Sequence, residues 1–304
     1  MGFPQPGIFA LGTASHAYLE FDVRPGYDVA ATVARVASLR EPRTTIGGVN
    51  LVAGFRPSLW AAVAPDAAIP GLTGFDSPIV GPADRTMPAT QHDVVTWITG
   101  ASYDVVFDLS RQILAGLTDE LVLVDEEVGW PYHHDLDLTG FIDGTENPNL
   151  VEAMGVAVVP DGSPGAGGSV LLLQRWEHDV PAWEGLPTEA QEAVIGRRKS
   201  DSEELDPVPP DSHVGRTDQD RFGRIFRRNI AYGTVRRHGT LFVGFCASQA
   251  PLVAMLESMV GAAGSPPGSE PADALMRFAR PLTGAFYAIP SVDRLAAFGP
   301  AADD

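Results

Sequence analysis

The sequence predicts an α+β sandwich made of two similar halves, each with one sheet and helices packed on it. Strand-like and helix-like segments alternate along the chain, and the loops between them permit antiparallel pairing. The segment DVVTWITGAS before one predicted helix is similar to GTLFVGFCAS before another. This indicates an internal duplication, although chance similarity of two strand–helix units explains the pair equally well. With 304 residues and 44% hydrophobic content, the chain can build one large or two medium cores.

The first half reads as strand, helix and strand, repeated once. Its expected strands are residues 15–23, 47–55, 93–98 and 119–128, and its expected helices are residues 26–39, after Pro25, and 102–117, opened by Ser102. A loop rich in proline and glycine separates the two repeats at residues 57–88. The apolar part of this loop, residues 57–82, would suit a contact between subunits.

The second half repeats this order. Its expected strands are residues 168–177, 225–232, 239–247 and 284–289, and its expected helices are residues 188–196, with Thr188 as a cap, 248–260 and 271–279. Two long connections, residues 129–150 and 197–224, carry no expected element. Because long irregular loops are uncommon in compact domains unless they have a function, these two connections are where we look for chemistry.

The charge balance excludes some classes of partner. A net charge of −18 and a pI near 4.6 disfavour binding to nucleic acid or to anionic membranes. No apolar run approaches the roughly 20 residues of a membrane span, and the first residues lack the basic flank and apolar stretch of a secretory signal. We therefore expect a soluble cytoplasmic protein. The single cysteine, Cys246, lies in an apolar run and is expected to be buried and unpaired.

The first candidate for chemistry is Asp143 in the segment GFIDGTENP. Gly144 next to it permits a sharp turn and leaves the backbone unshielded, so that a flat ligand could come close. An Asp-Gly turn at a domain junction, without any ligand, is the simpler interpretation of the same residues.

His213 is the second candidate, in the middle of the long polar connection. A lone histidine is more often a surface or core residue than a ligand, and none of the seven histidines pairs with Cys or His at zinc-like spacing.

Arg227 and Asn229 form the third candidate. On a strand they share one face and Arg228 takes the other, so the pair can enter a pocket while Arg228 reaches solvent. A solvated basic strand edge is the alternative.

Positive charge is concentrated in the same region, since ten of the 21 Lys and Arg residues lie between Arg197 and Arg237. Such a local basic patch in an acidic chain suits an anionic ligand. The competing account is that these side chains pair with nearby acids, which are Asp201, Glu203, Glu204, Asp206, Asp218 and Asp220.

Four segments in this order, GFIDGTENP, GRRKSDSEEL, SHV and FRRNIAYG, resemble the dye-decolourising peroxidases, specifically their short bacterial B-type branch. The similarity runs over nearly the whole chain. It implies two ferredoxin-like α+β halves with antiparallel sheets and packed helices, residues 1–139 and 140–304. It also implies one noncovalent b-type haem per chain, held mainly by the C-terminal half. The absence of a CxxCH motif agrees with noncovalent binding.

The resemblance also implies roles for individual residues. Asp143, Arg227 and Asn229 match the catalytic residues on the distal side of the haem. His213 matches the axial ligand of the iron, Asp273 the acid that accepts its other N–H, and Arg197 a partner of a haem propionate. Gly144 and Thr145 belong to the same cofactor-binding set. Ala231 departs from the family, in which a proline often precedes Tyr-Gly, and this puts the rigidity of that loop in doubt.

The activity implied is reduction of hydrogen peroxide through a ferryl intermediate, with oxidation of dyes, phenolics or similar one-electron donors. Aromatic side chains could pass electrons to the surface, and the candidates are Trp97, Trp130, Trp176, Trp183, Tyr132 and Tyr232. We expect a homo-oligomer, but not loading into encapsulin shells, because the sequence ends at AFGPAADD without the extension that some relatives use. Two alternatives are a haem-binding protein that handles iron, with incidental peroxidase activity, and a haem-free interaction module.

Overall fold

The strands of the two halves join in one sheet. The computed structural model describes residues 2–39, 48–264 and 266–299, and within these ranges it contains a ten-stranded antiparallel sheet and a separate two-stranded one. The strands are β1 Ser15–Val23, β2 Val49–Phe55, β3 Ile79–Val80, β4 Thr86–Met87, β5 Val94–Gly100, β6 Leu121–Trp130, β7 Ser169–His178, β8 Phe226–Arg227, β9 Ile230–Gly233, β10 His238–Cys246, β11 Ala279–Pro281 and β12 Ala285–Ile289. The expectation of one sheet per half is therefore wrong.

The large sheet closes on itself. Its order is β11-β7-β12-β2-β5-β1-β6-β9-β10-β8, and β7 also pairs with β10. The halves meet where Ala288 of β12 pairs with Phe55 of β2, and where β6 pairs with β9. Closure into a ring removes strand edges, so that only β11 and β8 are left at the ends of the order.

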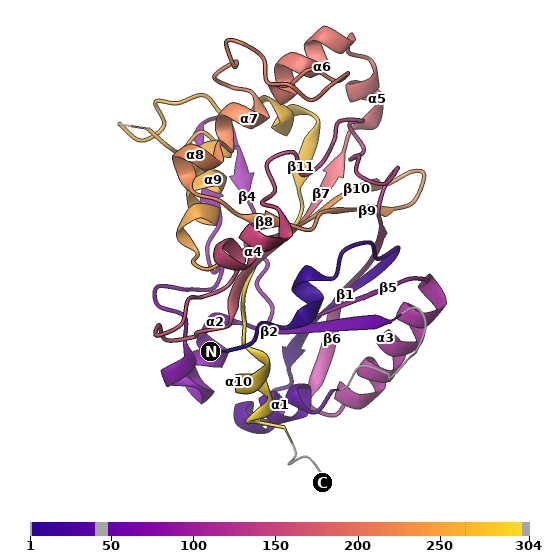
Figure 1. Ribbon diagram of the computed structural model, residues 1–304, viewed down its shortest axis with the longest axis vertical. Coiled ribbons are helices and arrows are strands. Elements are labelled where there is room, and N and C mark those ends of the chain that lie inside the picture. The colour runs from indigo at the N-terminus through magenta and orange to yellow at the C-terminus, as the bar shows by residue number, and fades with distance from the viewer. Residues whose placement is uncertain (1, 40–47, 265, 300–304) are drawn as a thin grey trace.

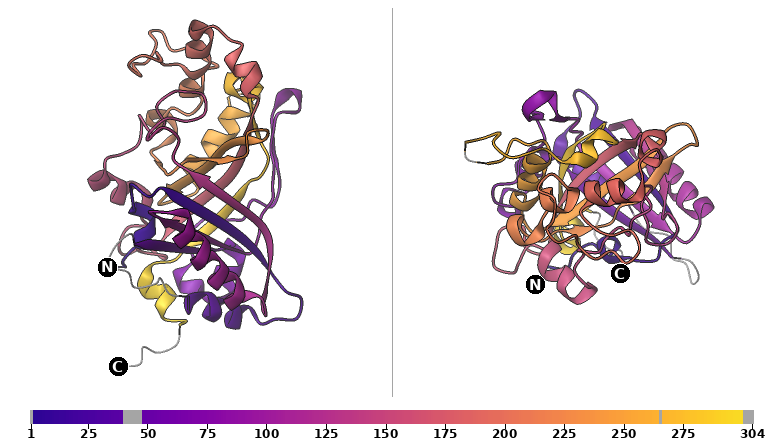
Figure 2. Two further views of the ribbon diagram at one scale, coloured as in Figure 1. Left: turned by 90° about the vertical axis from the view of Figure 1, so that its right-hand side faces the viewer. Right: turned by 90° about the horizontal axis from the view of Figure 1, so that it is seen from above.

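Most helices cover the outside of this ring (Figures 1 and 2). The helices are α1 Val29–Ala37, α2 Pro57–Val63, α3 Tyr103–Leu117, α4 Leu150–Ala157, α5 Val180–Glu184, α6 Thr188–Ile195, α7 His213–Arg216, α8 Gln219–Phe222, α9 Ala250–Met259 and α10 Val292–Ala296. Ala153 and Ala157 of α4, by contrast, pack against the core inside the ring. In Figure 1, α1, α3 and α10 lie at the lower end and α5 to α9 lie in the upper part.

Most strands are buried on both faces. In β1, Leu19 belongs to the core under α1 and α3, whereas its neighbour Tyr18 belongs to the core inside the ring. In β7, Leu171 faces the ring interior and Leu172 faces the core under α9. Because neighbouring side chains on a strand point to opposite faces, a strand between two cores can be apolar at consecutive positions, as β7 is at residues 170–173.

The α+β fold class predicted from the sequence is confirmed, and most expected elements occur within a few residues of their predicted bounds. Residue 47 of the strand expected at 47–55 lies outside the described residues. The strand expected at 225–232 is two short strands, β8 and β9. The helix expected at 271–279 is only a 3₁₀ turn, Ala274–Arg277.

Short helices were missed where the sequence suggested loops. Helix α2 begins at Pro57, whose fixed φ suits the first turn of a helix. Helix α4 begins after Asn149, whose side chain caps it. Cys246 is buried and free, as expected.

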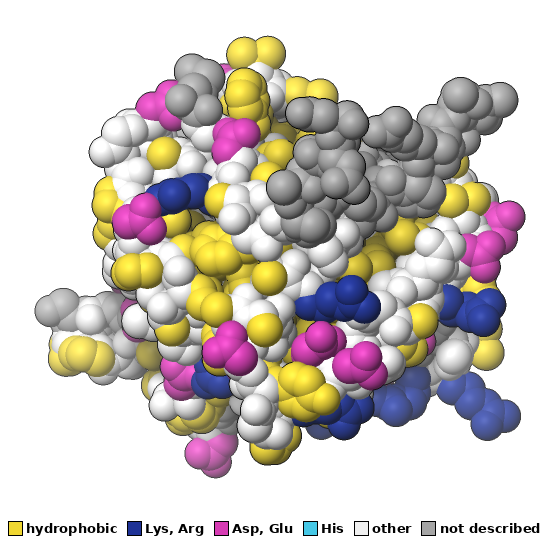
Figure 3. All heavy atoms as spheres, turned by 90° about the horizontal axis from the view of Figure 1, so that it is seen from below, with side chains coloured by type: hydrophobic (Ala, Val, Ile, Leu, Met, Phe, Trp, Pro, Cys, Tyr) yellow, Lys and Arg dark blue, Asp and Glu magenta, His cyan; other side chains and the backbone are white. Residues whose placement is uncertain are grey.

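The surface mixes charges and apolar side chains at the lower end of the molecule. Figure 3 views this end from below and shows acidic and basic side chains interspersed around hydrophobic ones. The net charge of −18 is therefore not gathered on this face. No helix among the described residues is both long enough and apolar enough to cross a membrane.

Strand β1 carries an acid, Glu20, whose carboxyl group is buried inside the ring. Glu20 of β1 is 7% exposed, and its carboxyl accepts a hydrogen bond from the hydroxyl of the fully buried Tyr287. Burial raises the pKa of Glu20 from 4.5 to about 7. The folded protein therefore holds a proton here that the unfolded chain releases.

This proton links stability to pH. Because the folded pKa is raised, the stabilisation is fully present below about pH 4.5 and is lost as the pH rises through about 7, with a total of about 3 kcal/mol. Glu20→Gln should remove this dependence, as measured by urea unfolding between pH 4.5 and 8. Glu126→Gln, at an exposed position on β6, should retain it. An unchanged slope in Glu20→Gln would contradict this assignment.

Candidate functional site

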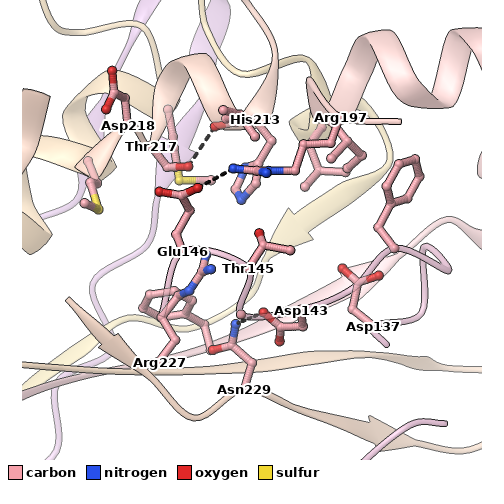
Figure 4. Close-up of a pocket in the computed structure, with 18 of the residues that line it drawn as sticks. Asp137, Asp143, Thr145, Glu146, Arg197, His213, Thr217, Asp218, Arg227 and Asn229 are labelled. Carbon is pink, nitrogen blue, oxygen red and sulfur yellow. Dashed lines mark hydrogen bonds and ion pairs between the residues drawn. The ribbon is translucent and has the colours of Figure 1, made fainter. Parts of the chain in front are cut away.

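A cavity of about 430 Å³ brings the two long connections together in the C-terminal part of the chain. Its walls come from residues 137–146, from residues 195–220, from β7, β8 and β10, and from α9 (Figure 4). One wall is apolar, and its members are Leu172, Trp176, Phe242, Leu252, Met255, Leu256, Met259 and Leu275. This volume and this mostly apolar lining are typical of sites for small molecules and cofactors.

His213 points into this cavity from the first residue of α7. Ser212 caps the helix, because its Oγ accepts a hydrogen bond from the Gly215 N–H at 3.2 Å. Thr217 Oγ1 donates to the His213 carbonyl at 2.7 Å. These contacts fix the backbone that carries the imidazole.

The buried carboxylate of Asp273 orients the imidazole. His213 Nδ1 lies 2.7 Å from Asp273 Oδ2, and Asp273 Oδ1 accepts from the Leu275 N–H at 2.8 Å. A carboxylate partner places the ring proton on Nδ1. Nε2 is then a free acceptor, and no hydrogen-bond partner for it occurs among the described residues. An imidazole held in this way is suited to ligate a metal.

The opposite wall carries the acid, the guanidinium and the amide expected from the sequence (Figure 4). Asn229 Nδ2 donates to Asp143 Oδ1 at 3.3 Å, while Asn229 Oδ1 accepts from the Val243 N–H at 3.1 Å. Arg227 has no ion pair within the described part of the chain, and its Nε is buried without a hydrogen-bond partner. Since an unpaired buried donor is costly, this guanidinium is suited to an anionic or polar ligand.

Arg228 does not reach solvent, contrary to the prediction. It is 8% exposed, and its guanidinium donates to the carbonyls of Ile8 and Ala10 at 2.7 and 2.6 Å. It also lies over the Trp97 ring, 5.1 Å from the centroid. The reason is that the other face of this strand meets the interior of the ring rather than water. Burial lowers the pKa of Arg228 to about 10.

Arg197 lies at the rim of the cavity and is already paired with acids. Its guanidinium contacts Glu146, lies 2.7 Å from Glu204 Oε1 and donates to the Ser202 carbonyl at 2.8 Å. Its Nε is buried without a partner. Figure 4 shows Glu146 between Arg197 and the Arg227 side of the cavity.

Most arginines of the basic patch pair with nearby acids, as the alternative interpretation of the sequence predicted. The arginines between 197 and 237 that pair with acids are Arg197, Arg198, Arg216, Arg221, Arg224 and Arg237. Of the acids named beforehand, Asp201, Glu203 and Glu204 take part. The cavity is therefore not lined by a general excess of positive charge, and Arg227 is its distinctive cation.

Gly144 and Thr145 both line the cavity. Gly144 has φ of +92°, a conformation that favours glycine. The backbone conformation of the turn after Asp143 is therefore enough to explain a glycine at this position.

Asp137 was missed at the sequence level. It lines the cavity near Asp143 (Figure 4) and accepts a hydrogen bond from the Thr139 N–H at 2.8 Å. Burial, and then repulsion from Asp143, raises the pKa of Asp137 to about 6. Its position six residues before Asp143, in an alternating acidic and apolar stretch, was the only available signal.

Comparison with known proteins agrees with this architecture. A family model described as "Dyp-type peroxidase, C-terminal" matches residues 134–294. The dye-decolorizing peroxidase of Mycolicibacterium paratuberculosis is 36% identical over 220 residues, which are 69% of this chain and 61% of that protein. The one from Rhodococcus erythropolis is 31% identical over 306 residues, 96% of this chain and 88% of the relative. The matches span less than two thirds of the first of these relatives.

Solved structures are similar over nearly the whole chain. A dye-decolorizing peroxidase from Bacteroides thetaiotaomicron has a TM-score of 0.87 at 28% identity, covering 98% of both chains. DyPB from Rhodococcus jostii RHA1 has a TM-score of 0.84 at 33% identity, covering 97% of both chains. A variant of that protein was solved in complex with heme.

The fold and cavity together define an α+β protein with two ferredoxin-like halves and a large cavity in its C-terminal part. The chain belongs to the Dyp-type, or dye-decolorizing, peroxidase family.

The proximity of the two acids predicts a measurable coupling. Asp143→Asn removes the neighbouring negative charge and should lower the pKa of Asp137 from about 6, while burial keeps it above its ordinary value. Carboxyl ¹³C shifts followed through a pH titration would measure this. Asp161→Asn, at an exposed position outside the cavity, is the control. An unchanged pKa of Asp137 in Asp143→Asn would contradict the coupling.

Proposed function

We propose that this chain is a haem peroxidase that reduces hydrogen peroxide and oxidises one-electron donors such as dyes or phenolics. One observation carries the proposal. A single cavity has an imidazole backed by a buried carboxylate on one wall, and an acid held by an amide together with an unpaired guanidinium on the other. Relatives that are named dye-decolorizing peroxidases support it.

The residues present fit a haem. His213 Nε2 is the free nitrogen for the iron, and the apolar wall suits the macrocycle. Arg197 offers a buried Nε without a partner toward a carboxylate, which supports it as a propionate partner in competition with Glu146 and Glu204. Cys246 is buried and does not line the cavity, so we propose noncovalent haem b, one per chain. When bound, the haem supplies the iron at which the O–O bond is cleaved.

On the proximal side, Asp273 holds the imidazole through a hydrogen bond to Nδ1. A histidine that donates to a carboxylate is a stronger electron donor to a bound metal. The buried position of Asp273, 1% exposed, keeps this hydrogen bond from competition with water.

On the distal side, Asp143 has a role in proton transfer and Arg227 has an electrostatic role. Asp143 would accept a proton from one oxygen of peroxide and return it to the other, which then leaves as water. The Asn229 amide occupies Asp143 Oδ1, which leaves Oδ2 for the proton. The Arg227 guanidinium stabilises the negative charge on the departing oxygen. Gly144 and Thr145 line the same cavity and would hold the turn of the acid beside the cofactor.

Electrons from bulky donors need a path to this cavity. Of the six aromatic candidates, Trp176 lines it, and we propose Trp176 as the first relay. Trp130, 40% exposed, presents an aromatic ring to solvent on β6.

The remaining features are proposed from the sequence. We propose a cytoplasmic homo-oligomer with residues 57–82 at a subunit contact, and a boundary between the halves at residues 139 and 140. Haem or iron handling is not favoured as the main function, because a carrier needs no acid–base pair and the relatives are named peroxidases.

The division of roles on the distal side predicts unequal effects of two substitutions. Arg227→Leu should slow the first spectral change after mixing with peroxide by about 10²–10³-fold. Asp143→Ala should slow it less, because the guanidinium still supports cleavage. Stopped-flow absorbance would measure both. Arg224→Leu, outside the cavity, is the matched control. An Arg227→Leu rate equal to that of the wild type would overturn the assignment.

The axial role of His213 predicts loss of the cofactor spectrum. Wild-type protein reconstituted with haem should show a Soret band that shifts with one equivalent of peroxide, whereas His213→Ala should show a weakened, displaced band without that response. His238→Ala, which lies outside the cavity, should behave as the wild type. A normal response in His213→Ala would sink the proposal.

A further inference from the structure

Strand β8, which carries Arg227, has one open edge. It is the last strand in the sheet order and pairs only with β10 among the described strands. The backbone N–H of Arg228 donates to the Val243 carbonyl of β10 at 2.8 Å. The N–H and C=O of Arg227 therefore point away from β10, toward the open edge, where backbone groups need other partners.

The side chain of Asn147 occupies this edge. The Arg227 N–H donates to Asn147 Oδ1 at 2.8 Å, and Asn147 Nδ2 donates to the Arg227 carbonyl at 2.8 Å. One amide thus satisfies both backbone groups of Arg227, as a neighbouring strand would do. Asn147 does not line the large cavity, and the hydrogen bonds of its side chain run to the backbone of Arg227.

Asn147 belongs to the loop that carries Asp143. Its own N–H donates to the Gly144 carbonyl at 2.9 Å and closes the turn that follows Asp143. In the other direction, Asn229 reaches from the strand to the Asp143 carboxylate at 3.3 Å. Two asparagines therefore connect the loop and the strand, one through the backbone of Arg227 and one through the side chain of Asp143.

We propose that Asn147 is a positioning residue that sets the Arg227 guanidinium against the Asp143 carboxylate. The role in turnover rests on the function proposed above, whereas the backbone contact does not depend on haem. Asn147→Ala leaves both backbone groups of Arg227 without this partner, and the strand at residue 227 is then held on the β10 side only.

The backbone contact can be tested without haem. Hydrogen exchange of the Arg227 amide, measured by NMR on the haem-free chain, should accelerate about tenfold or more in Asn147→Ala. Asn147→Asp, which keeps the acceptor for this N–H, should restore much of the protection. Asn149→Ala is the matched control, since Asn149 caps α4 with two hydrogen bonds and does not contact Arg227. Unchanged exchange at Arg227 in Asn147→Ala would overturn the proposal.

The consequence for the site is tested with fluoride as an anionic probe of the ferric holoenzyme. Asn147→Ala should weaken fluoride binding about tenfold, the equivalent of roughly one hydrogen bond, as followed by absorbance. In an Arg227→Leu background the same change should have no further effect, because Asn147 acts through Arg227. Asn149→Ala should lower the melting temperature but leave fluoride affinity unchanged.

The outcomes separate the two proposals. Equal weakening with and without Arg227 would contradict a positioning role and leave the peroxidase proposal intact. A wild-type protein that binds no haem would contradict the peroxidase proposal, and the exchange experiment would still decide on the Asn147 contact. If Asn147→Ala does not fold, Asn147→Ser, whose hydroxyl can satisfy only one of the two backbone groups, should show the same effects with smaller amplitude.

Discussion

The hydrogen bond between His213 and Asp273 is the interaction on which the rest of the site depends. It joins a short helix in the long polar connection to a segment that packs beside α9, over a separation of 60 residues. It also decides which imidazole nitrogen faces the cavity. Without it, the imidazole would be one of several half-exposed histidines, and the acid and guanidinium on the far wall would face no ligand for a metal.

The closed ring of strands provides the rigid support for the opposite wall. Strands with a core on each face cannot shift register without exposing apolar side chains, and β10 therefore holds Asn229 and β8 firmly. The wall is completed by side chains rather than by another strand, because β8 lies at the end of the sheet order. The site thus lies where the regular sheet ends and where polar loops can approach it.

Local patterns in the sequence predicted part of this site, and long-range contacts account for the rest. The alternation of side chains along a strand placed Arg227 and Asn229 on one face, and both line the cavity. Arg228 takes the other face as the rule requires, but the expectation that this face meets solvent was wrong, because ring closure and the carbonyls near residue 8 bury it. Asp137 could not be recognised, because its raised pKa arises from burial that no local pattern encodes. The roles assigned to Asp143, His213 and Asp273 stay predictions.

The proposed function requires one cofactor between His213 and the Asp143–Arg227 pair. An anomalous difference map at the iron edge, from crystals of the haem-reconstituted protein, tests it most directly. We expect a single strong peak within bonding distance of His213 Nε2, with Asp143 and Arg227 on the opposite side of the porphyrin. Iron bound by another residue, or outside this cavity, would contradict it.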